Sequence, residues 1–473
     1  MGNKTARNIA IYSFMSFFQK GISFFLVPLY TYLLTPEEFG LANEIIAITS
    51  FFILFFSFGL DESAVRLYFP VRHDKSKNKI VLGTIILTSI FISFISCLLL
   101  LLFKDFIFTP FVNGITYPLI LLSILLVGSS PLFAIHQKLL KIQEKAISFT
   151  LLSLFFSLTQ ILLSICFIVY LDLKTTGYIL AITLTQLLFF LISLISLKSE
   201  ICWKVDFNVL KESFSYGIKV APHTISGWFS KGFTLLAIGN LLDSFLVGIF
   251  NAMNFLAIII NVISKAILDA FQPWIYDKLE NPKINNKSLF DVAKFMGILI
   301  ILIGFFLSLF SNELIKMFIN ENYHDGIYLV PFLVYSSLIL FIGSLLVYVL
   351  YYDKTKTHLI GISSLAGAIL NIILCLYLIP NLQLFGAALS VAISNTITAL
   401  IKQYYASKAL KSNNFLKDLY FLAILNLLLS FFLNEYNYFI RISIFVLELV
   451  IIYYYYKKII SFFILKIPFK SWR

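Results

Sequence analysis

A stripe of polar side chains interrupts the first long apolar segment of the sequence. Lys20 lies near the middle of that segment. Ser13, Ser16 and Ser23 share its face at helical spacing, and Gln19 borders that face. A charge at the centre of a membrane helix costs about 2.5–3.5 kcal/mol on insertion scales, so it faces a cavity or a partner. The stripe predicts a cationic surface for an anionic group, unless Lys20 pairs with a carboxylate or extends to the membrane surface.

A second stripe follows about two hundred residues later. Lys219, His223, Ser226 and Ser230 share one helical face, and Lys231 lies at its edge. The same anion-binding chemistry is expected here, although Lys219 is close enough to one end of its segment to reach the membrane surface. His223 titrates near neutral pH in an ordinary environment, so it could couple transport to protons. The alternative for His223 is a hydrogen bond to a neighbouring helix.

Three further charged sites stand at segment ends. Arg66 closes the second apolar segment and could contact an anionic group at the mouth of a cavity, or pair with Asp61–Glu62. Glu44 lies one turn inside the other end of that segment, as an interfacial carboxylate or a proton or sodium site. Lys265 and Asp269 are four residues apart, which predicts a structural ion pair on one helix.

The elements that carry these groups are membrane helices. The chain has 473 residues, of which 60% are hydrophobic and only 13% charged, whereas soluble domains average about 45–50% and about 25%. This composition excludes a soluble enzyme, a secreted disulfide scaffold and a disordered chain. Fourteen segments approach the roughly 20 apolar residues that span a bilayer. Their short connections predict an all-α bundle of antiparallel neighbours.

The distribution of Lys and Arg predicts the orientation. With a cytoplasmic N-terminus, 28 of the 36 Lys and Arg residues fall in the termini and loops on the cytoplasmic side, and four fall in the loops outside. Because cytoplasmic loops are enriched in these residues, both termini are expected inside. The net charge of +12 is then a topology signal that requires no nucleic acid.

The sequence also repeats itself at an offset of 208 residues. Gly40 aligns with Gly248, and Leu60-Asp61 aligns with Leu268-Asp269. Six spans separate equivalent positions, so both halves face the same way, as in transporters whose substrate passes between two lobes. We expect a six-helix lobe at residues 1–205, a second at 206–412, and two further helices with a basic tail at 413–473.

Motifs for catalysis and for metal binding are absent from the sequence. No glycine-rich P-loop, catalytic carboxylate pair or nucleophile elbow occurs, which disfavours direct use of ATP and enzymatic chemistry. The four cysteines are scattered without metal-ligand spacing. We therefore expect no catalytic residue, no metal site and no bound cofactor other than a proton or sodium ion for coupling.

Two segments resemble a known family. The first runs from Leu26-Val27-Pro28-Leu29-Tyr30 through Leu33 to Gly40 and on to Phe69, and the second is Pro222 to Trp228. Together with Asn371, Ile379-Pro380 and Gly386-Ala387-Ala388, they resemble the polysaccharide-biosynthesis flippase (Wzx) family of the multidrug/oligosaccharidyl-lipid/polysaccharide exporter superfamily. The resemblance covers essentially the whole chain.

This resemblance implies a transporter of the bacterial inner membrane. Its cargo would be an undecaprenyl-pyrophosphate-linked oligosaccharide for O-antigen, capsule or exopolysaccharide, moved from the cytoplasmic to the periplasmic leaflet. Membrane lipids, a polysaccharide polymerase and a chain-length regulator are the other partners expected. The candidate residues are Lys20, Lys219, Lys231, Arg66 and Gln19 for the cargo, and His223 and Glu44 for a coupling ion.

Two alternatives remain open. A cation-coupled multidrug exporter would need an acidic cavity for cationic drugs, whereas the two stripes are basic and neutral. A membrane oligosaccharide polymerase is disfavoured further, because such enzymes use a sizeable outside loop and the loops here are short.

Overall fold

The computed structural model is helical, with no strand in the part of the chain that it describes. That part comprises residues 25–280, 286–352, 356, 358–410, 416–434 and 436–466. The all-α fold expected from the composition is therefore confirmed.

The helices pack into two compact units. Unit 1 comprises Met1–Asn251 with Cys375–Gln383, and unit 2 comprises Ala252–Leu374 with Leu384–Arg473. The helices of unit 1 are α2 (Pro36–Ser57), α3 (Leu60–Val71), α4 (Lys75–Leu102), α5 (Lys104–Ile107), α6 (Tyr117–Ile142), α7 (Ala146–Ile165) with the π-helix η1 (Cys166–Tyr170), α8 (Lys174–Leu197), α9 (Phe207–Phe229), α10 (Gly232–Leu241) and α11 (Ser244–Met253).

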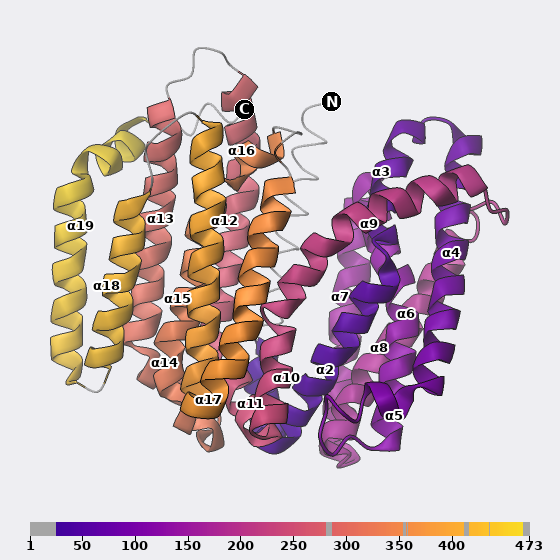
Figure 1. Ribbon diagram of the computed structural model, residues 1–473, viewed down its shortest axis with the longest axis horizontal. Coiled ribbons are helices and arrows are strands. Elements are labelled where there is room, and N and C mark those ends of the chain that lie inside the picture. The colour runs from indigo at the N-terminus through magenta and orange to yellow at the C-terminus, as the bar shows by residue number, and fades with distance from the viewer. Residues whose placement is uncertain are drawn as a thin grey trace. The chain divides into compact units, whose positions relative to one another are not determined.

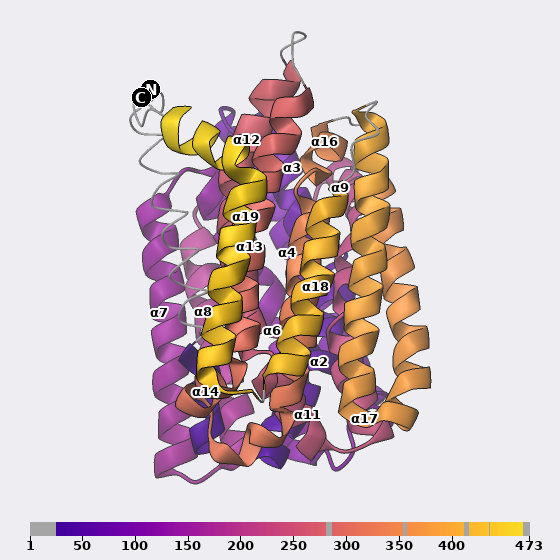
Figure 2. The ribbon, with the colours of Figure 1, turned by 90° about the vertical axis from the view of Figure 1, so that its left-hand side faces the viewer.

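Unit 2 continues the chain with a second set of helices. These are α12 (Phe255–Glu280), α13 (Asn286–Leu309), α14 (Ser311–Phe318), the 3₁₀ helix η2 (Glu321–Leu329), α15 (Val330–Ser344), α16 (Val347–Tyr352), α17 (His358–Ala409, of which Cys375–Gln383 belongs to unit 1), α18 (Lys417–Leu433) and α19 (Tyr438–Lys466). The last two helices, α18 and α19, lie side by side against α13 (Figure 2).

Ten helices of the described chain are long and apolar enough to cross a membrane. One of them, α17, contains two predicted spans, because its backbone breaks at Gln383 with φ 50° and ψ −133°. The ten do not include α9, which is more polar, or α18, which has only 17 residues. Thirteen of the fourteen predicted span centres fall in described helices, and the first, at Lys20, lies outside the described residues.

Side chains next to the helix starts explain where α2, α4 and α9 begin. Thr35 and Glu38 form a capping box, in which the Glu38 amide donates to the Thr35 hydroxyl at 3.3 Å, and Pro36 occupies the first turn. Asp74 accepts from the amides at the start of α4, at 3.1 and 3.2 Å. Asp206 does the same for α9 at 2.8 and 3.2 Å. These caps satisfy amides that lack a partner within the helix.

The second predicted span is broken into α2 and α3. Phe58 and Gly59 both adopt left-handed backbone angles, with φ 46° and 65°. A Cβ atom at Gly59 would lie 2.9 Å from the Cα and carbonyl oxygen of Gly217 in α9, so the break is also a site of close backbone approach. This break directs α3 along α4, α6 and α9.

Large apolar side chains cover the outside of α4. Phe91, Phe94, Leu98 and Leu102 are exposed and lie on one helical face. The opposite side of α4 contributes Leu82, together with neighbours from α3 and α6, to the buried core of unit 1. An exposed face of this length and apolarity is typical of contact with lipid.

Candidate functional site

Helix α9, which carries the second polar stripe, packs on α2, α3 and α4 and runs obliquely across them (Figure 1). Trp228 fixes it to α2, because its indole nitrogen donates to the Ala47 carbonyl at 2.8 Å and to the Ser50 hydroxyl at 3.1 Å. The stripe is therefore held by the same unit that contains the first five described spans.

Lys231 lies at the break between α9 and α10. Its backbone (φ −124°, ψ −59°) separates the two helices, and its side chain is exposed. Helix α10 continues for 10 residues to Leu241, about 15 Å at the usual rise per residue. That length is about half of a hydrocarbon core of about 30 Å. No described residue forms a hydrogen bond or ion pair with the Lys231 ammonium group.

The other predicted stripe residues differ in their surroundings. Lys219 is exposed on α9, whereas Ser226, two turns further on, is buried. The face is therefore open only in part. His223 lies in α9, but its side chain is outside the described part. Lys20 and Gln19 also lie outside the described residues. The roles assigned to Lys20, Gln19, Lys219 and His223 therefore stay predictions.

Glu44 is fully buried in α2. Neither of its carboxylate oxygens makes a hydrogen bond of ordinary geometry with a described residue, and Ser244 is the polar side chain beside it. On α10, Gly239 leaves the space that this carboxylate fills, since a Cβ atom there would overlap it. A carboxylate enclosed in this way is costly to ionise.

Arg66 is exposed on α3, and the expected local pairing with Asp61–Glu62 is wrong. Lys138 of α6 forms ion pairs with both carboxylates instead. Its ammonium nitrogen lies 2.7 Å from Glu62 Oε1 and is in contact with Asp61 Oδ2. The predicted pair on α12 is present, with Lys265 Nζ 2.7 Å from Asp269 Oδ1.

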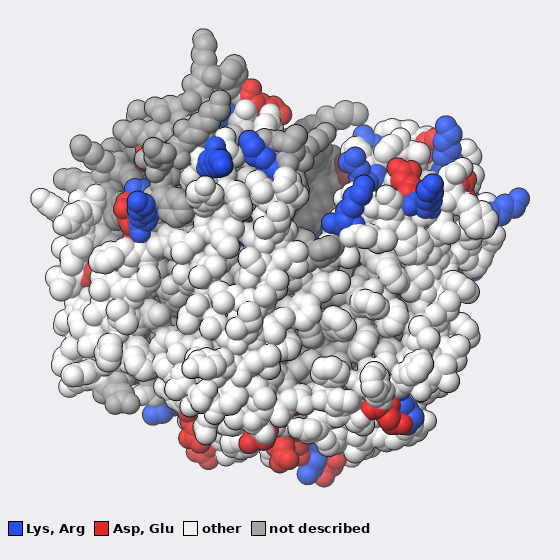
Figure 3. Space-filling model, viewed as in Figure 1, with Lys and Arg blue, Asp and Glu red and all other residues white. Residues whose placement is uncertain are grey.

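One end of unit 1, here called the basic end, is where α3, α6 and α8 finish. Lys and Arg residues gather along it (Figure 3). They are Arg66, Arg72, Lys75, Lys77, Lys79, Lys141, Lys145, Lys198 and Lys204. The connections at the opposite end of unit 1 contribute Lys104 and Lys174.

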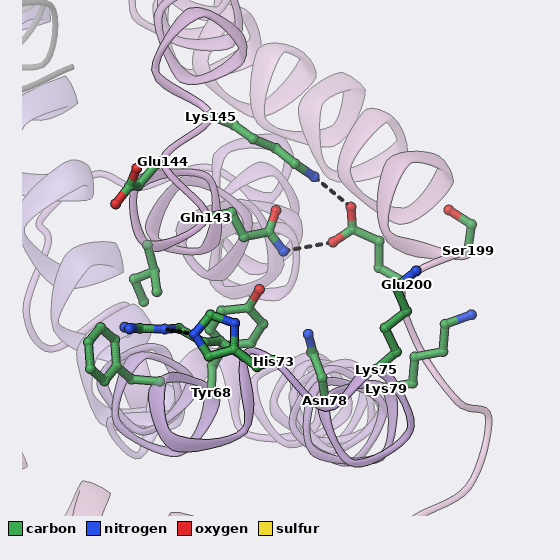
Figure 4. Close-up of a pocket in the computed structure, with 13 residues that line it drawn as sticks. Tyr68, His73, Lys75, Asn78, Lys79, Gln143, Glu144, Lys145, Ser199 and Glu200 are labelled. Carbon is green, nitrogen blue, oxygen red and sulfur yellow. Dashed lines mark hydrogen bonds and ion pairs between the residues drawn. The ribbon is translucent and has the colours of Figure 1, made fainter. Parts of the chain in front are cut away.

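A pocket of about 690 Å³ opens at the basic end (Figure 4). It is formed by the α3–α4, α6–α7 and α8–α9 connections. Its lining residues are Tyr68, Phe69, Arg72, His73, Lys75, Asn78, Lys79, Ile142, Gln143, Glu144, Lys145, Ser199 and Glu200. The α8–α9 connection is tied to α4 by hydrogen bonds from the Cys202 amide to the Lys79 carbonyl (2.8 Å) and from the Asp206 amide to the Thr84 hydroxyl (3.0 Å).

One carboxylate of this pocket is saturated by its neighbours. Glu200 accepts from Lys145 Nζ and from Gln143 Nε2, each at 2.8 Å. Partial burial opposes ionisation, but these two hydrogen bonds outweigh it and hold the pKa of Glu200 below its ordinary value. The charge of Lys145 is therefore already compensated.

Within the described residues, no three His, Cys, Asp or Glu side chains form a group that could hold a metal ion. The four cysteines are free thiols.

The comparisons with known proteins decide the family. Residues 30–328, more than half of the chain, match the family described as polysaccharide biosynthesis protein. The chain belongs to this family. It is 27% identical over 205 residues to the capsular polysaccharide biosynthesis protein CapF of Staphylococcus aureus. That match covers 42% of this chain and spans half the length of CapF.

Solved structures show the fold. The lipid II flippase MurJ, in an inward closed conformation, matches with a TM-score of 0.71 at 17% identity, over 95% of this chain and 100% of that one. A multidrug resistance MATE family transporter in an inward-facing conformation matches at 0.63 and 15% identity, over 85% of this chain and 96% of that one. These neighbours have a fourteen-helix, two-lobe fold, and this family member is likewise a multi-pass membrane protein.

Sequence reasoning missed two features of unit 1. Lys138 was counted among the topology signals, although it is the partner of Asp61 and Glu62. The basic pocket was missed because its cations come from two separate connections, α3–α4 and α6–α7, and its other lining residues include a third. The signal available in the sequence was the excess of Lys and Arg over Asp and Glu in the connections that form the pocket.

Proposed function

We propose that this protein is a flippase that moves an undecaprenyl-pyrophosphate-linked oligosaccharide from the cytoplasmic to the periplasmic leaflet of the bacterial inner membrane. Membership of the polysaccharide biosynthesis family supports a cargo of this class. The observation that carries the proposal is Lys231, an exposed cation at about half the depth of a span, with no partner among the described residues.

The chemistry of such a cargo explains why a lysine would stand there. A pyrophosphate cannot cross hydrocarbon without solvation, and a lysine without a partner is itself costly inside a membrane. Binding of the anion would relieve that penalty and add attraction. The ammonium group is a compact point charge that can follow a moving phosphate without a fixed geometry. Lys20, Lys219 and Gln19 complete the proposed cargo path, with Arg66 at its cytoplasmic mouth.

The distribution of basic residues supports the orientation. Because the basic end of unit 1 carries most of its Lys and Arg residues, it is proposed to face the cytoplasm. Both chain termini would then be cytoplasmic as well, as the count over the whole sequence predicts. A polysaccharide polymerase and a chain-length regulator remain proposed partners.

Glu44 is the proposed site of ion coupling. It is a buried carboxylate between α2 and α10 without a hydrogen bond of ordinary geometry to a described residue. Protonation would remove the cost of its charge, and release of the proton would favour separation of the two helices. His223 is the second candidate for this role.

A multidrug exporter is the other function that the fold allows, since MATE transporters share it. The multidrug exporter and the proposed flippase differ in the charge of the cargo that they bind. An exporter of cationic drugs would be hindered by an exposed lysine at mid-depth, whereas a pyrophosphate carrier needs one. A polymerase would bind the same anionic cargo and act on it without moving it, so movement of the cargo across the membrane, and not its charge, distinguishes it from a flippase.

Complementation of a strain that lacks this protein tests the proposal. Lys231→Ala is expected to abolish surface polysaccharide at a normal protein level in the membrane, and Lys231→Arg to retain part of it. Lys265→Ala is the matched control, because Lys265 pairs with Asp269 on the same helix. Full polysaccharide production by Lys231→Ala would contradict the role of this lysine.

A further inference from the structure

The pocket at the basic end lies at the level of lipid headgroups. The spans of unit 1 that border it end at Val71, Ile142 and Leu197 and begin at Lys75. Its lining residues fall within a few positions of these ends. A bilayer's polar headgroup region lies just beyond the hydrocarbon core that such spans cross. The pocket is therefore placed where a headgroup, rather than an acyl chain, would enter it.

The lining carries uncompensated positive charge. Arg72, Lys75 and Lys79 form no ion pair with a described residue. Glu200 is paired with Lys145, and Glu144 points away from the centre of the pocket (Figure 4). Lys75 and Lys79 are four residues apart in the first turns of α4, so they share a face. Like charges held close together in this way favour an anion between them.

Arg72 is held in place before any ligand arrives. Its guanidinium carbon lies 4.0 Å from the centroid of the Phe69 ring, and its Nε donates to His73 Nε2 at 2.9 Å. Stacking and one hydrogen bond leave its two terminal nitrogens to donate elsewhere. A fixed guanidinium of this kind suits two-pronged binding of a phosphate.

Neutral hydrogen-bonding groups line the pocket between these cations. Tyr68 directs its hydroxyl group toward the cavity, and the Asn78 amide nitrogen points the same way (Figure 4). The Asn78 side-chain oxygen is buried and has no hydrogen-bond partner among the described residues. Together with Gln143, these groups could bind hydroxyls or ester oxygens beside a phosphate.

We propose that this pocket binds the phosphate-bearing headgroup of a membrane lipid at the cytoplasmic surface. Its volume of about 690 Å³ falls in the range of about 300–1,000 Å³ that holds small-molecule ligands, which is more than a single phosphate ion needs. Two lipids carry the required chemistry: a polyprenyl diphosphate and an anionic phospholipid. The first source rests on the proposed function, since the pocket would then load the cargo; the second rests on the proposed orientation alone.

The test uses the full-length protein in detergent with a local reporter. A fluorinated label on Ser199→Cys, in a background with the four native cysteines replaced by serine, reports occupancy by ¹⁹F NMR. The probes are geranyl diphosphate, dioctanoyl phosphatidylglycerol and, as the zwitterionic control, dioctanoyl phosphatidylcholine. The variants are Lys75→Gln with Lys79→Gln, and Arg72→Gln. Lys77→Gln is the matched control, because Lys77 lies in the same turns but lines a different hollow.

At least one anionic probe is expected to shift the ¹⁹F signal, and the double variant to weaken its binding about tenfold, as loss of charge-assisted contacts predicts. Lys77→Gln should bind as the unsubstituted protein does. A response to geranyl diphosphate alone assigns the pocket to the cargo, and a response to phosphatidylglycerol alone assigns it to bulk lipid. Either response supports a headgroup site, and this result does not depend on the outcome of the transport assay.

The proposal is overturned if neither anionic probe shifts the signal, if phosphatidylcholine binds as tightly as phosphatidylglycerol, or if the double variant and Lys77→Gln bind equally well. Because each variant replaces only exposed side chains, its unfolding temperature should equal that of the labelled parent. A variant with a lower value is replaced by Arg72→Lys, which keeps the charge and loses the two-pronged geometry, and should bind with intermediate affinity.

Discussion

Gly40 of α2 and Gly248 of α11 pack against each other's helix in a reciprocal way. A Cβ atom at Gly40 would overlap the Ser244 carbonyl oxygen, and one at Gly248 would overlap the Pro36 carbonyl oxygen. Pro36 and Ser244 are also equivalent in the 208-residue repeat. Gly40 thus meets the repeat equivalent of Pro36, and Gly248 meets Pro36 itself. A reciprocal contact of this kind is what a two-fold axis produces. The repeat detected in the sequence is therefore a structural relationship at this crossing.

This crossing predicts that neither glycine tolerates a side chain. Gly40→Ala and Gly248→Ala should each lower the free energy of unfolding by about 1–3 kcal/mol, the usual cost of overpacking, because the obstructing atoms are backbone. Denaturant unfolding of the purified protein measures the change. Gly227→Ala is the control, since nothing lies within 4 Å of its Cβ position. If Gly40→Ala and Gly248→Ala lower the free energy of unfolding no more than Gly227→Ala does, this packing is contradicted.

The ion cluster of Lys138 with Asp61 and Glu62 predicts a stability effect that can be rescued. Lys138→Ala leaves two adjacent carboxylates without their cation, at an expected cost of about 1–3 kcal/mol, since all three side chains are only partly exposed. Adding Asp61→Asn should recover part of the loss. Lys104→Ala removes an exposed pair with Asp105 and should cost less than about 1 kcal/mol. Equal losses from both lysines would argue against the cluster.

The sequence predicts the spans well because hydropathy is a property of one segment at a time. The caps at Thr35 and Asp74 are local in the same sense, because their partners lie within three residues. The Lys138 cluster was not predictable in this way, because its members are 76 and 77 positions apart. Nothing in the local sequence distinguishes Lys138 from Arg66 as the partner of Asp61.

Two other features needed the fold. The left-handed break at Gly59 could be suspected from the glycine alone, but its contact with Gly217 depends on how α9 packs. Lys231 was identified from its place in an apolar segment, whereas the helix break that exposes it is seen only in the structure.

The ion pair between Glu313 and Arg441 in unit 2 predicts a pH dependence. Arg441 is buried and donates to Glu313 Oε2 at 2.9 Å and to the Leu309 carbonyl at 2.9 Å. Partial burial opposes ionisation of Glu313, but the hydrogen bonds from Arg441 outweigh it and hold the pKa of Glu313 below its ordinary value. A carboxylate with a depressed folded-state pKa stabilises the protein above its unfolded pKa of about 4.3 and loses this effect as the pH falls further.

The unfolding temperature measured between pH 3 and pH 7 tests this pair. Unsubstituted protein should exceed Glu313→Gln by a constant margin above about pH 5, and that margin should shrink below about pH 4. A margin independent of pH throughout that range would contradict the pair's contribution.

The orientation predicts the outcome of reporter fusions. A fusion after Lys75 and one after Ser407 should report the cytoplasm, while one after Asn113 should report the periplasm, because the proposed orientation places the basic connections inside. A periplasmic signal after Lys75 would reverse the assignment and place the pocket at the basic end on the wrong surface for a cytoplasmic lipid.

Translocation of a lipid-linked oligosaccharide in proteoliposomes tests the central claim most directly. The purified protein is reconstituted with a fluorescent polyprenyl-pyrophosphate oligosaccharide, and the fraction that becomes accessible to a membrane-impermeant quencher or lectin is followed over time. We expect transfer by the unsubstituted protein and by Lys265→Ala, slower transfer by Lys231→Arg, and background transfer by Lys231→Ala. Transfer at the background rate by the unsubstituted protein, or an undiminished rate with Lys231→Ala, would contradict a flippase that uses this lysine to carry a pyrophosphate.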